Sequence, residues 1–346
     1  MPANFRSDNE NPVAPEIMEA LTRANEGTAY SYGDDAITER VKDRFCEVFE
    51  TDLEVFPLVS GTAANALAVA QTTPPYGAVI CHQDSHLHTD ECGAPEFYSG
   101  GAKLLTLAGA SGKLEPKSVR ERIAEAGYVG DHASKPCLLS LTQATEFGTV
   151  YSVEEVGELA QVAHEAGLAV HMDGARFANA LCSLGCSAAE MTWRSGVDLL
   201  SFGATKNGAM MAEALLVFDA DDAGELGRRR KQAGHLISKM RYVSAQLDAY
   251  LADDLWLELA AHANRMATRL AEGLEDAQDV ELVYPVHGNE IFVRMEEGFA
   301  ECLRDDGFEF YGWPGRPGLY RLVTAHCTAE SEVDEFLDAI QALDGE

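Results

Sequence analysis

Positive charge is scarce in this sequence. Its 346 residues include only eight lysines, and the 26 lysines and arginines are outnumbered by 57 aspartates and glutamates, so that the formal net charge is -31. A surface this acidic repels the phosphate backbone of nucleic acids, and we expect no nucleic-acid partner. It is instead typical of a protein whose charged surface favours solubility.

Long apolar runs and paired cysteines are missing as well. No run reaches the ~18 apolar residues of a membrane span, and the initial stretch MPANFRSDNENP has no apolar signal-peptide segment. We therefore expect a cytoplasmic protein without membrane attachment. The eight cysteines form no CxxC pair and several lie in apolar stretches such as ALCSLGC, which is typical of reduced, buried thiols. Neither GxGxxG nor GxxxxGKS/T occurs, so a nucleotide is not the expected ligand.

Short apolar stretches alternate with amphipathic segments of helical length over the first two thirds of the chain. We predict strands at 54–59, 78–81, 103–107, 136–142, 168–173, 197–202 and 214–218, and helices at 61–73, 115–126 and 152–167. This alternation predicts an α/β fold with a mostly parallel sheet covered on both faces. The pattern turns helical near residue 219, and an α+β segment with strands at 290–295 and 318–323 ends the chain. We expect a large domain over 1–254, which includes an N-terminal arm, and a small domain over 255–346.

Three features fall at the ends of predicted strands, where open α/β sheets bind their ligands. Lys206 lies in a turn between the strands 197–202 and 214–218, and Asp173 ends the strand 168–173. Ser60, Gly61 and Thr62 lie where a strand passes into a helix. The free N–H groups of such a helix start, and its dipole, favour a phosphate group.

The chemistry of these features converges on one cofactor. A buried carboxylate such as that of Asp173 needs a cationic partner, which is a metal, Arg176 or the protonated ring nitrogen of a pyridine. A lysine in apolar surroundings has a lowered pKa, and its free amine condenses with aldehydes. A phosphate cup, a carboxylate and a lysine in this order predict pyridoxal 5′-phosphate (PLP).

The stretch CHQDSHLHTDECG carries three histidines, His82, His86 and His88. The HxH spacing would suit a metal-dependent hydrolase, but no further pair with ligand spacing follows, and we expect no metal. In a PLP enzyme, a histidine at a strand end stacks on the pyridine ring and relays protons. We expect His82 to be a solvent-facing loop residue.

Seven motifs extend over nearly the whole chain: RSDN (6–9), YGDD (32–35), SGTAAN (60–65), DSHLHTDECG (84–93), HMDGARFANA (171–180), SFGATKNGA (201–209) and RLVTAH (321–326). In these motifs the chain resembles the L-threonine aldolase family, within the β-eliminating lyase branch of the aspartate-aminotransferase-like (fold type I) PLP enzymes. The resemblance implies a large domain with a seven-stranded sheet and a small C-terminal α+β domain. It also implies a homo-oligomer, a dimer or a dimer of dimers, with shared active sites.

The resemblance assigns roles by position. The catalytic residues would be Lys206, which bonds to the cofactor aldehyde, Asp173, which pairs with the pyridine nitrogen, and His86, which stacks on the ring. The other cofactor-binding residues would be Ser60, Gly61, Thr62 and Arg176, with Lys231 and Arg241 reaching a neighbouring subunit's cofactor phosphate. The residues that bind the substrate carboxylate would be Ser7, Arg176 and Arg321. An arginine fork suits this last role because it holds a carboxylate with two hydrogen bonds.

One stretch departs from the family pattern. Where many members have an ENTH-like sequence whose histidine is a candidate base, this chain reads TQATEFG, with Thr145 at that position. Threonine does not act as a base at neutral pH. We therefore look for the proton acceptor among His86, His88, Glu91 and a bound water.

The reaction expected from the resemblance is the cleavage of L-threonine, L-allo-threonine or a related β-hydroxy-α-amino acid such as phenylserine into glycine and an aldehyde. The first alternative is another PLP-dependent β-eliminating lyase, or an aminotransferase, acting on a small amino acid. A second alternative is a catalytically silent protein of the same fold, which would need neither Lys206 nor Asp173.

Overall fold

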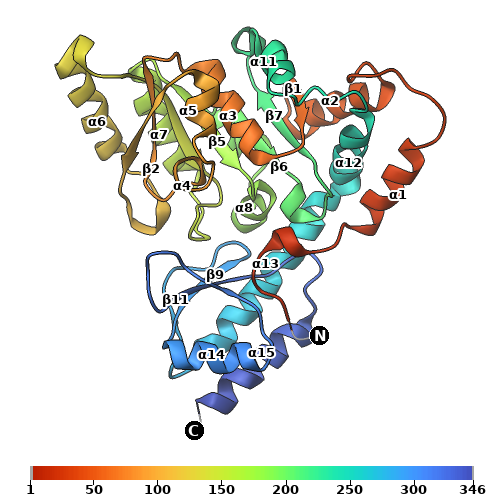
Figure 1. Cartoon of the computed structure of the whole chain (residues 1–346), viewed down its shortest axis with the longest axis vertical. Helices are drawn as coiled ribbons and strands as arrows, with labels where there is room; N and C mark the ends of the chain where they lie inside the picture. The colour runs from red at the N-terminus through yellow and green to blue at the C-terminus, as the bar shows by residue number, and fades with distance from the viewer. Residues whose placement is uncertain (1–2, 345–346) are drawn as a thin grey trace.

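The computed structural model describes residues 3–344 and consists of a large and a small α/β domain (Figure 1). The strands of the large sheet are β1 (Glu54–Leu58), β2 (Gly77–His82), β3 (Lys103–Leu107), β4 (Lys135–Thr142), β5 (Ala169–Gly174), β6 (Leu199–Gly203) and β7 (Glu213–Val217). Their order is β1-β7-β6-β5-β4-β2-β3, and β7 is antiparallel to both neighbours while the strands from β6 to β3 are parallel. The prediction of a mostly parallel seven-stranded sheet is confirmed.

Helices cover both faces of this sheet. They are α1 (Pro15–Ala24), α2 (Ala36–Phe49), α3 (Gly61–Thr72), α4 (His86–Thr89), α5 (Ala94–Ser99), α6 (Pro116–Val129), α7 (Val153–Glu165), α8 (Phe177–Leu184), α9 (Ala188–Met191), α10 (Ala220–Ala223), α11 (Leu226–Gln232) and α12 (Arg241–Leu251). The start of α7 is fixed by a capping box, in which the Ser152 side chain accepts from the N–H of Glu155 and the Glu155 carboxylate accepts from the N–H of Ser152.

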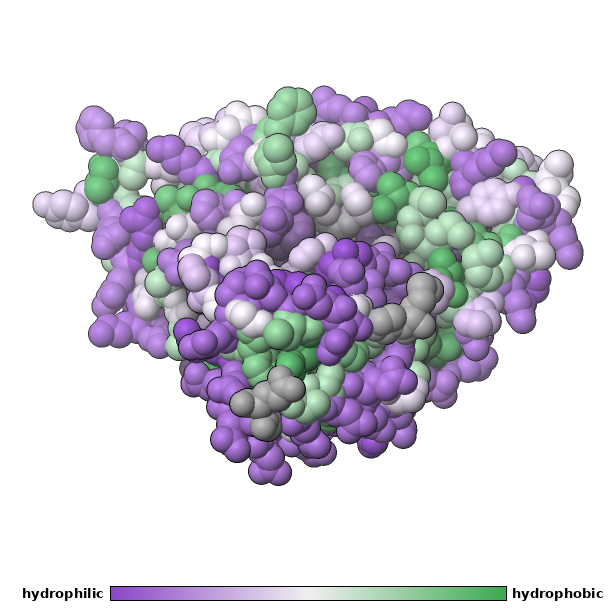
Figure 2. Space-filling model, turned by 60° about the horizontal axis from the view of Figure 1, so that its bottom comes forward, coloured by the Kyte–Doolittle hydropathy of each residue, from purple (hydrophilic) through white to green (hydrophobic). Residues whose placement is uncertain are grey.

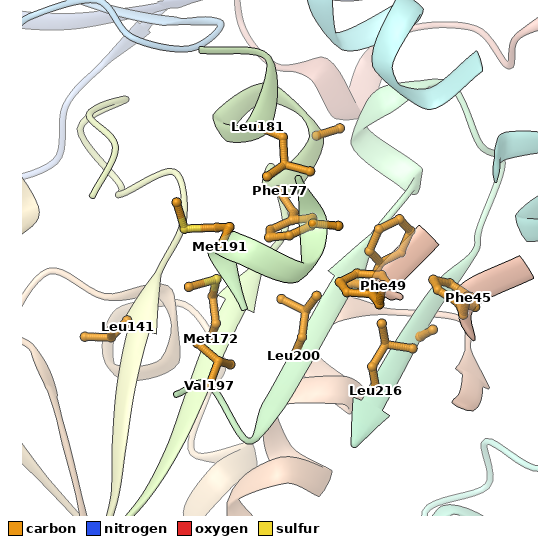
Figure 3. Close-up of a cluster of buried hydrophobic side chains, with 14 of the residues drawn as sticks. Phe45, Phe49, Leu141, Met172, Phe177, Leu181, Met191, Val197, Leu200 and Leu216 are labelled. Atoms are coloured by element: carbon orange, nitrogen blue, oxygen red, sulfur yellow. The ribbon is translucent and has the colours of Figure 1, made fainter. Parts of the chain in front are cut away.

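Successive side chains of each strand point to opposite faces and build two cores. Leu200 of β6 belongs to the larger core, together with Phe49 of α2 and Phe177 of α8, whereas its neighbour Leu199 packs with Leu67 of α3 on the other face. In Figure 3 the same side of the sheet presents side chains from four adjacent strands, those of Leu141, Met172, Leu200 and Leu216.

The small domain is an antiparallel sheet backed by helices. Its strands are β8 (Glu281–Leu282), β9 (Glu290–Arg294), β10 (Tyr311–Gly312) and β11 (Leu319–Val323), in the order β10-β11-β9-β8, and its helices are α14 (Glu297–Asp305) and α15 (Glu330–Leu343). The N-terminal segment packs against this domain. The ring centroids of Phe5 and Phe336 lie 5.2 Å apart, and the Phe5 N–H donates to the Glu309 carbonyl.

Helix α13 (Leu255–Leu274) runs from one domain into the other (Figure 1). Near its start, Trp256 and Ala260 belong to the core of the large domain, and further along, Met266 and Leu270 belong to the core of the small domain. The boundary near residue 255 stays a prediction, because this helix contributes to the cores of both domains. The two cores are therefore joined through a continuous helix.

Figure 2 shows hydrophilic residues over most of one face, with hydrophobic residues in small separate patches. No helix within residues 3–344 is both long enough and apolar enough to cross a membrane. All eight cysteines are free thiols; Cys81 is buried, whereas Cys182 and Cys186 of the ALCSLGC stretch are only partly buried.

Candidate active site

A cavity of about 420 Å³ opens where the parallel strands of the large sheet end and the small domain approaches them. The small domain contributes Glu290, Trp313 and Arg321 to its wall. The predicted site residues that line this cavity are Ser7, Ser60, Gly61, Thr62, His86, Asp173, Arg176, Lys206 and Arg321. One cavity therefore gathers residues that the sequence separates by more than 300 positions.

The first wall of the cavity is the start of helix α3. Ser60 has extended backbone angles and caps the helix, its Oγ accepting a hydrogen bond from the N–H of Ala63 at 3.3 Å. The N–H groups of Gly61 and Thr62 lie in the first turn, so no carbonyl within the helix can accept from them. They are available to an anion, and the positive end of the helix dipole adds to the attraction.

A chain of polar side chains lies beside this helix start. The amide nitrogen of Asn65 donates to Asp173 Oδ2 and to Glu91 Oε1, both at 2.7 Å, and Glu91 Oε1 also lies 3.0 Å from His86 Nδ1. The hydrogen bond with Glu91 raises the pKa of His86, although burial opposes it. Asn65 and Glu91 thereby fix the orientation of both Asp173 and His86.

Lys206 lies at the floor of the cavity, in a short 3-10 turn (Thr205–Asn207) between β6 and β7. Burial lowers the pKa of its amine, and the nearby guanidinium of Arg176 lowers it further, while the surrounding carboxylates oppose the shift. A larger fraction of the amine is therefore neutral and nucleophilic than in an exposed lysine.

The two arginines expected to bind a substrate carboxylate have different surroundings. Arg176 holds Asp8 with two hydrogen bonds, of 2.7 and 3.0 Å, and its Nη1 lies 3.2 Å from Glu290 Oε2. Arg321 has one carboxylate contact, Glu290 Oε1 at 3.3 Å, and its buried Nε has no hydrogen-bond partner among the described residues. Arg321 is therefore the arginine with a free donor, whereas the fork of Arg176 is engaged by Asp8.

The predictions for His86, His82 and Thr145 have different outcomes. His86 lines the cavity as expected. The prediction that His82 faces solvent is wrong, because β2 continues through it, the side chain is only 4% exposed, and Nε2 lies 3.1 Å from the Gly109 carbonyl. Thr145 is buried away from the cavity, where its hydroxyl contacts Thr149 Oγ1 at 2.8 Å.

Glu146 and Glu213 are among the cavity residues that were missed in the sequence analysis. Burial raises the pKa of each carboxyl group to about 7. Both lie next to apolar segments, Glu146 four residues after β4 and Glu213 as the first residue of β7. An acidic residue beside a buried strand end is a signal that would have found them, as it found Asp173.

The two remaining predicted cofactor residues lie outside this cavity. Lys231 Nζ lies 4.5 Å above the Tyr32 ring, and Arg241 donates to the Gly27 carbonyl at 3.4 Å. In the part of the chain that the structure describes, no three His, Cys, Asp or Glu residues are grouped so as to hold a metal ion.

The lining residues fit PLP. The N–H groups at the start of α3 suit its phosphate, the carboxylate held by Asn65 suits its protonated ring nitrogen, and the amine of Lys206 suits its aldehyde. The buried Nε of Arg321 still offers a donor to the carboxylate of an amino acid.

Comparisons with known proteins agree with this site. Residues 4–298 match the β-eliminating lyase family model. The chain is 45% identical over 339 residues to a low specificity L-threonine aldolase of Pseudomonas sp. (strain NCIMB 10558), covering 98% of this chain and 97% of that protein. It is 47% identical to the protein of the same name from Pseudomonas aeruginosa, covering 91% and 90%.

A solved structure is also closely similar. The Leishmania major threonine aldolase superposes with a TM-score of 0.93 at 30% identity, covering 99% of this chain and 100% of that chain. The family predicted from the sequence is confirmed. The chain belongs to the β-eliminating lyase family, whose members are fold type I enzymes that use PLP.

Proposed function

We propose that this protein is a PLP-dependent aldolase that cleaves L-threonine, L-allo-threonine or a related β-hydroxy-α-amino acid into glycine and an aldehyde. The observation that carries the proposal is the single cavity that unites Lys206, Asp173, the start of α3 and Arg321. Relatives that are 45 and 47% identical bear the name low specificity L-threonine aldolase. They favour this reaction over β-elimination or aminotransfer.

The cofactor would be held at both ends. The N–H groups of Gly61 and Thr62 would hold its phosphate, and Asp173, positioned by Asn65, would pair with its ring nitrogen. PLP, when bound through Lys206, supplies an electron sink for the pair of electrons released when the Cα–Cβ bond breaks. His86, whose Nδ1 is held by Glu91, would contact the ring.

The substrate would be oriented by its carboxylate. Arg321 donates to that group through its Nε and lies above Trp313, its guanidinium carbon 5.6 Å from the ring centroid. Ser7 lines the same part of the cavity. Arg176 would help to position the site residues rather than bind the substrate carboxylate alone, because its charge is balanced by Asp8 and Glu290.

A substrate panel tests the proposal. The purified enzyme with PLP is incubated with threonine, allo-threonine, phenylserine and serine, while aldehyde and glycine are measured. We expect equal amounts of aldehyde and glycine from at least the first three substrates. Formation of a keto acid, with or without ammonia and without glycine, would instead show aminotransfer or elimination.

We further propose that the enzyme is a cytoplasmic homo-oligomer, a dimer or a homotetramer, with shared active sites. Lys231 and Arg241 lie outside their own cavity, and the Tyr32 ring that Lys231 contacts is 45% exposed. The free state of all eight cysteines suits a reducing compartment.

Mixing inactive subunits tests the shared site. Lys206→Ala and Arg241→Ala subunits should each be inactive, and a mixture should recover part of the activity, because a mixed dimer contains one intact site. Absence of recovery under conditions in which subunits exchange would contradict the proposal.

A further inference from the structure

Glu146 is one of the acidic residues of the cavity to which the proposed mechanism assigns no role. Glu146 lies in the loop after β4, and its Oε1 accepts two hydrogen bonds of 2.8 Å, from the N–H of His86 and from the hydroxyl of Thr142. Its Oε2 is buried and has no hydrogen-bond partner within residues 3–344. Because Oε1 is fixed by two donors, the carboxylate is held rigidly with one oxygen left for a ligand.

The neighbouring candidates for proton transfer are less suitable. Thr145 is buried, its hydroxyl lies 2.8 and 3.2 Å from other protein oxygens, and it does not line the cavity. Within the described part of the chain Glu91 also has an unpartnered Oε2, but its Oε1 is held by His86 and Asn65 and the residue does not line the cavity. Glu146 does line it, next to His86.

We propose that Glu146 is the residue that accepts the proton of the substrate's β-hydroxyl group, an inference that rests on the proposed aldolase function. In the cleavage direction, the hydroxyl proton passes to Glu146 Oε2 and the O–H electron pair becomes the second bond of the aldehyde carbonyl. The Cα–Cβ bond breaks, and its electron pair stays with the glycine fragment, whose Cα later takes up one proton. In synthesis, the protonated carboxyl returns its proton to the new hydroxyl group.

The surroundings of Glu146 suit this role at neutral pH. Burial raises its pKa to about 7, and hydrogen bonds from the protein oppose the shift. The titratable groups that face Glu146 are Cys81 of β2, His86 of α4, Asp173 of β5 and Tyr151, which precedes α7. The carboxyl group can therefore take up and release a proton within the pH range in which the enzyme would work.

The Glu146→Gln variant tests the inference. The amide oxygen of glutamine preserves both hydrogen bonds of Oε1, so the loop should keep its structure, while the proton acceptor is lost. We expect kcat for threonine cleavage to fall about 10²- to 10³-fold, within the range for loss of a general acid–base group. The rise of wild-type kcat/KM as pH increases through about 7 should also disappear. The exposed Glu154→Gln in α7 is the matched control and should keep the wild-type pH profile.

Two further measurements separate this role from a structural one. The affinity of the variant for PLP, titrated by absorbance, should remain within about threefold of wild type. Exchange of the glycine Cα hydrogen with deuterium, followed by NMR, should also persist, because this reaction involves no β-hydroxyl group. If cleavage by the variant is unimpaired, or if PLP binding or glycine exchange falls as much as cleavage, the inference is wrong. If the wild type itself releases no aldehyde from β-hydroxy amino acids, the proposed function fails instead.

Discussion

Replacing Glu213 by glutamine should stabilise the enzyme at alkaline pH and leave its stability unchanged in acid. Glu213 is 7% exposed at the start of β7, and burial raises its pKa from 4.5 to about 7. Below pH 4.5 the carboxyl group is protonated in both the folded and the unfolded chain. Between pH 4.5 and 7 the unfolded chain releases its proton and the folded chain retains it, so wild-type stability falls as the pH rises.

The size of the effect follows from the shift. A difference of about 2.5 pKa units corresponds to roughly 3 kcal/mol, which the wild type loses by pH 8 and the glutamine variant does not. For a chain of this length, that difference corresponds to about 5 °C in Tm. The assay compares the melting temperatures of wild type and variant without cofactor at pH 5, 6, 7 and 8. The exposed Glu272→Gln in α13 controls for the loss of a surface charge. A Tm difference that is constant from pH 5 to pH 8 would refute the reasoning.

Three other substitutions test the site and the core. Lys206→Ala should abolish turnover and leave no PLP covalently attached after borohydride reduction; a reduced adduct found by mass spectrometry at the active site would contradict its role. Arg321→Ala should weaken threonine binding by about 2–5 kcal/mol, the usual effect of losing one partner of a buried charge pair, and should barely change the binding of amines without a carboxylate; an unchanged KM for threonine would exclude this role. Phe202→Ala should lower the free energy of unfolding by about 3–5 kcal/mol, because the Phe202 ring centroid lies 5.1 Å from that of Phe45 and 5.7 Å from that of Trp256. Chemical denaturation measures this free energy. A loss below about 1 kcal/mol would mean that the core rearranges to fill the cavity.

Local patterns in the sequence predicted the strands and the start of α3. The strand 103–107 agrees with β3 in both bounds, because its apolar residues are flanked by glycines at both ends. Asp173 and Lys206 were found for a similar reason, since each stands at the end of an apolar stretch. Information of this kind lies within a few residues of the feature that it predicts.

Partners that are distant in sequence could not be predicted in this way. Asp8 engages Arg176 across 168 positions, and the sequence alone gave no reason to expect that Arg176 would already be paired. The error at His82 has the same origin, because the Gly109 carbonyl that covers the ring comes from a loop 27 residues away. Glu146 is an intermediate case. The sequence shows that it follows a buried strand, but whether its side chain reaches the cavity depends on the conformation of the loop after β4.

Helix α13 has a practical consequence for dividing the protein. A cut before Leu255 would remove Trp256 and Ala260 from the core of the large domain and leave them as an apolar stripe on the small fragment. A cut after Leu274 would transfer Met266 and Leu270 to the large fragment and leave a gap in the core of the small one. Neither fragment would have a complete interior, so expression of either half alone should give aggregated protein, and circular permutants or fusions should keep residues 255–274 intact.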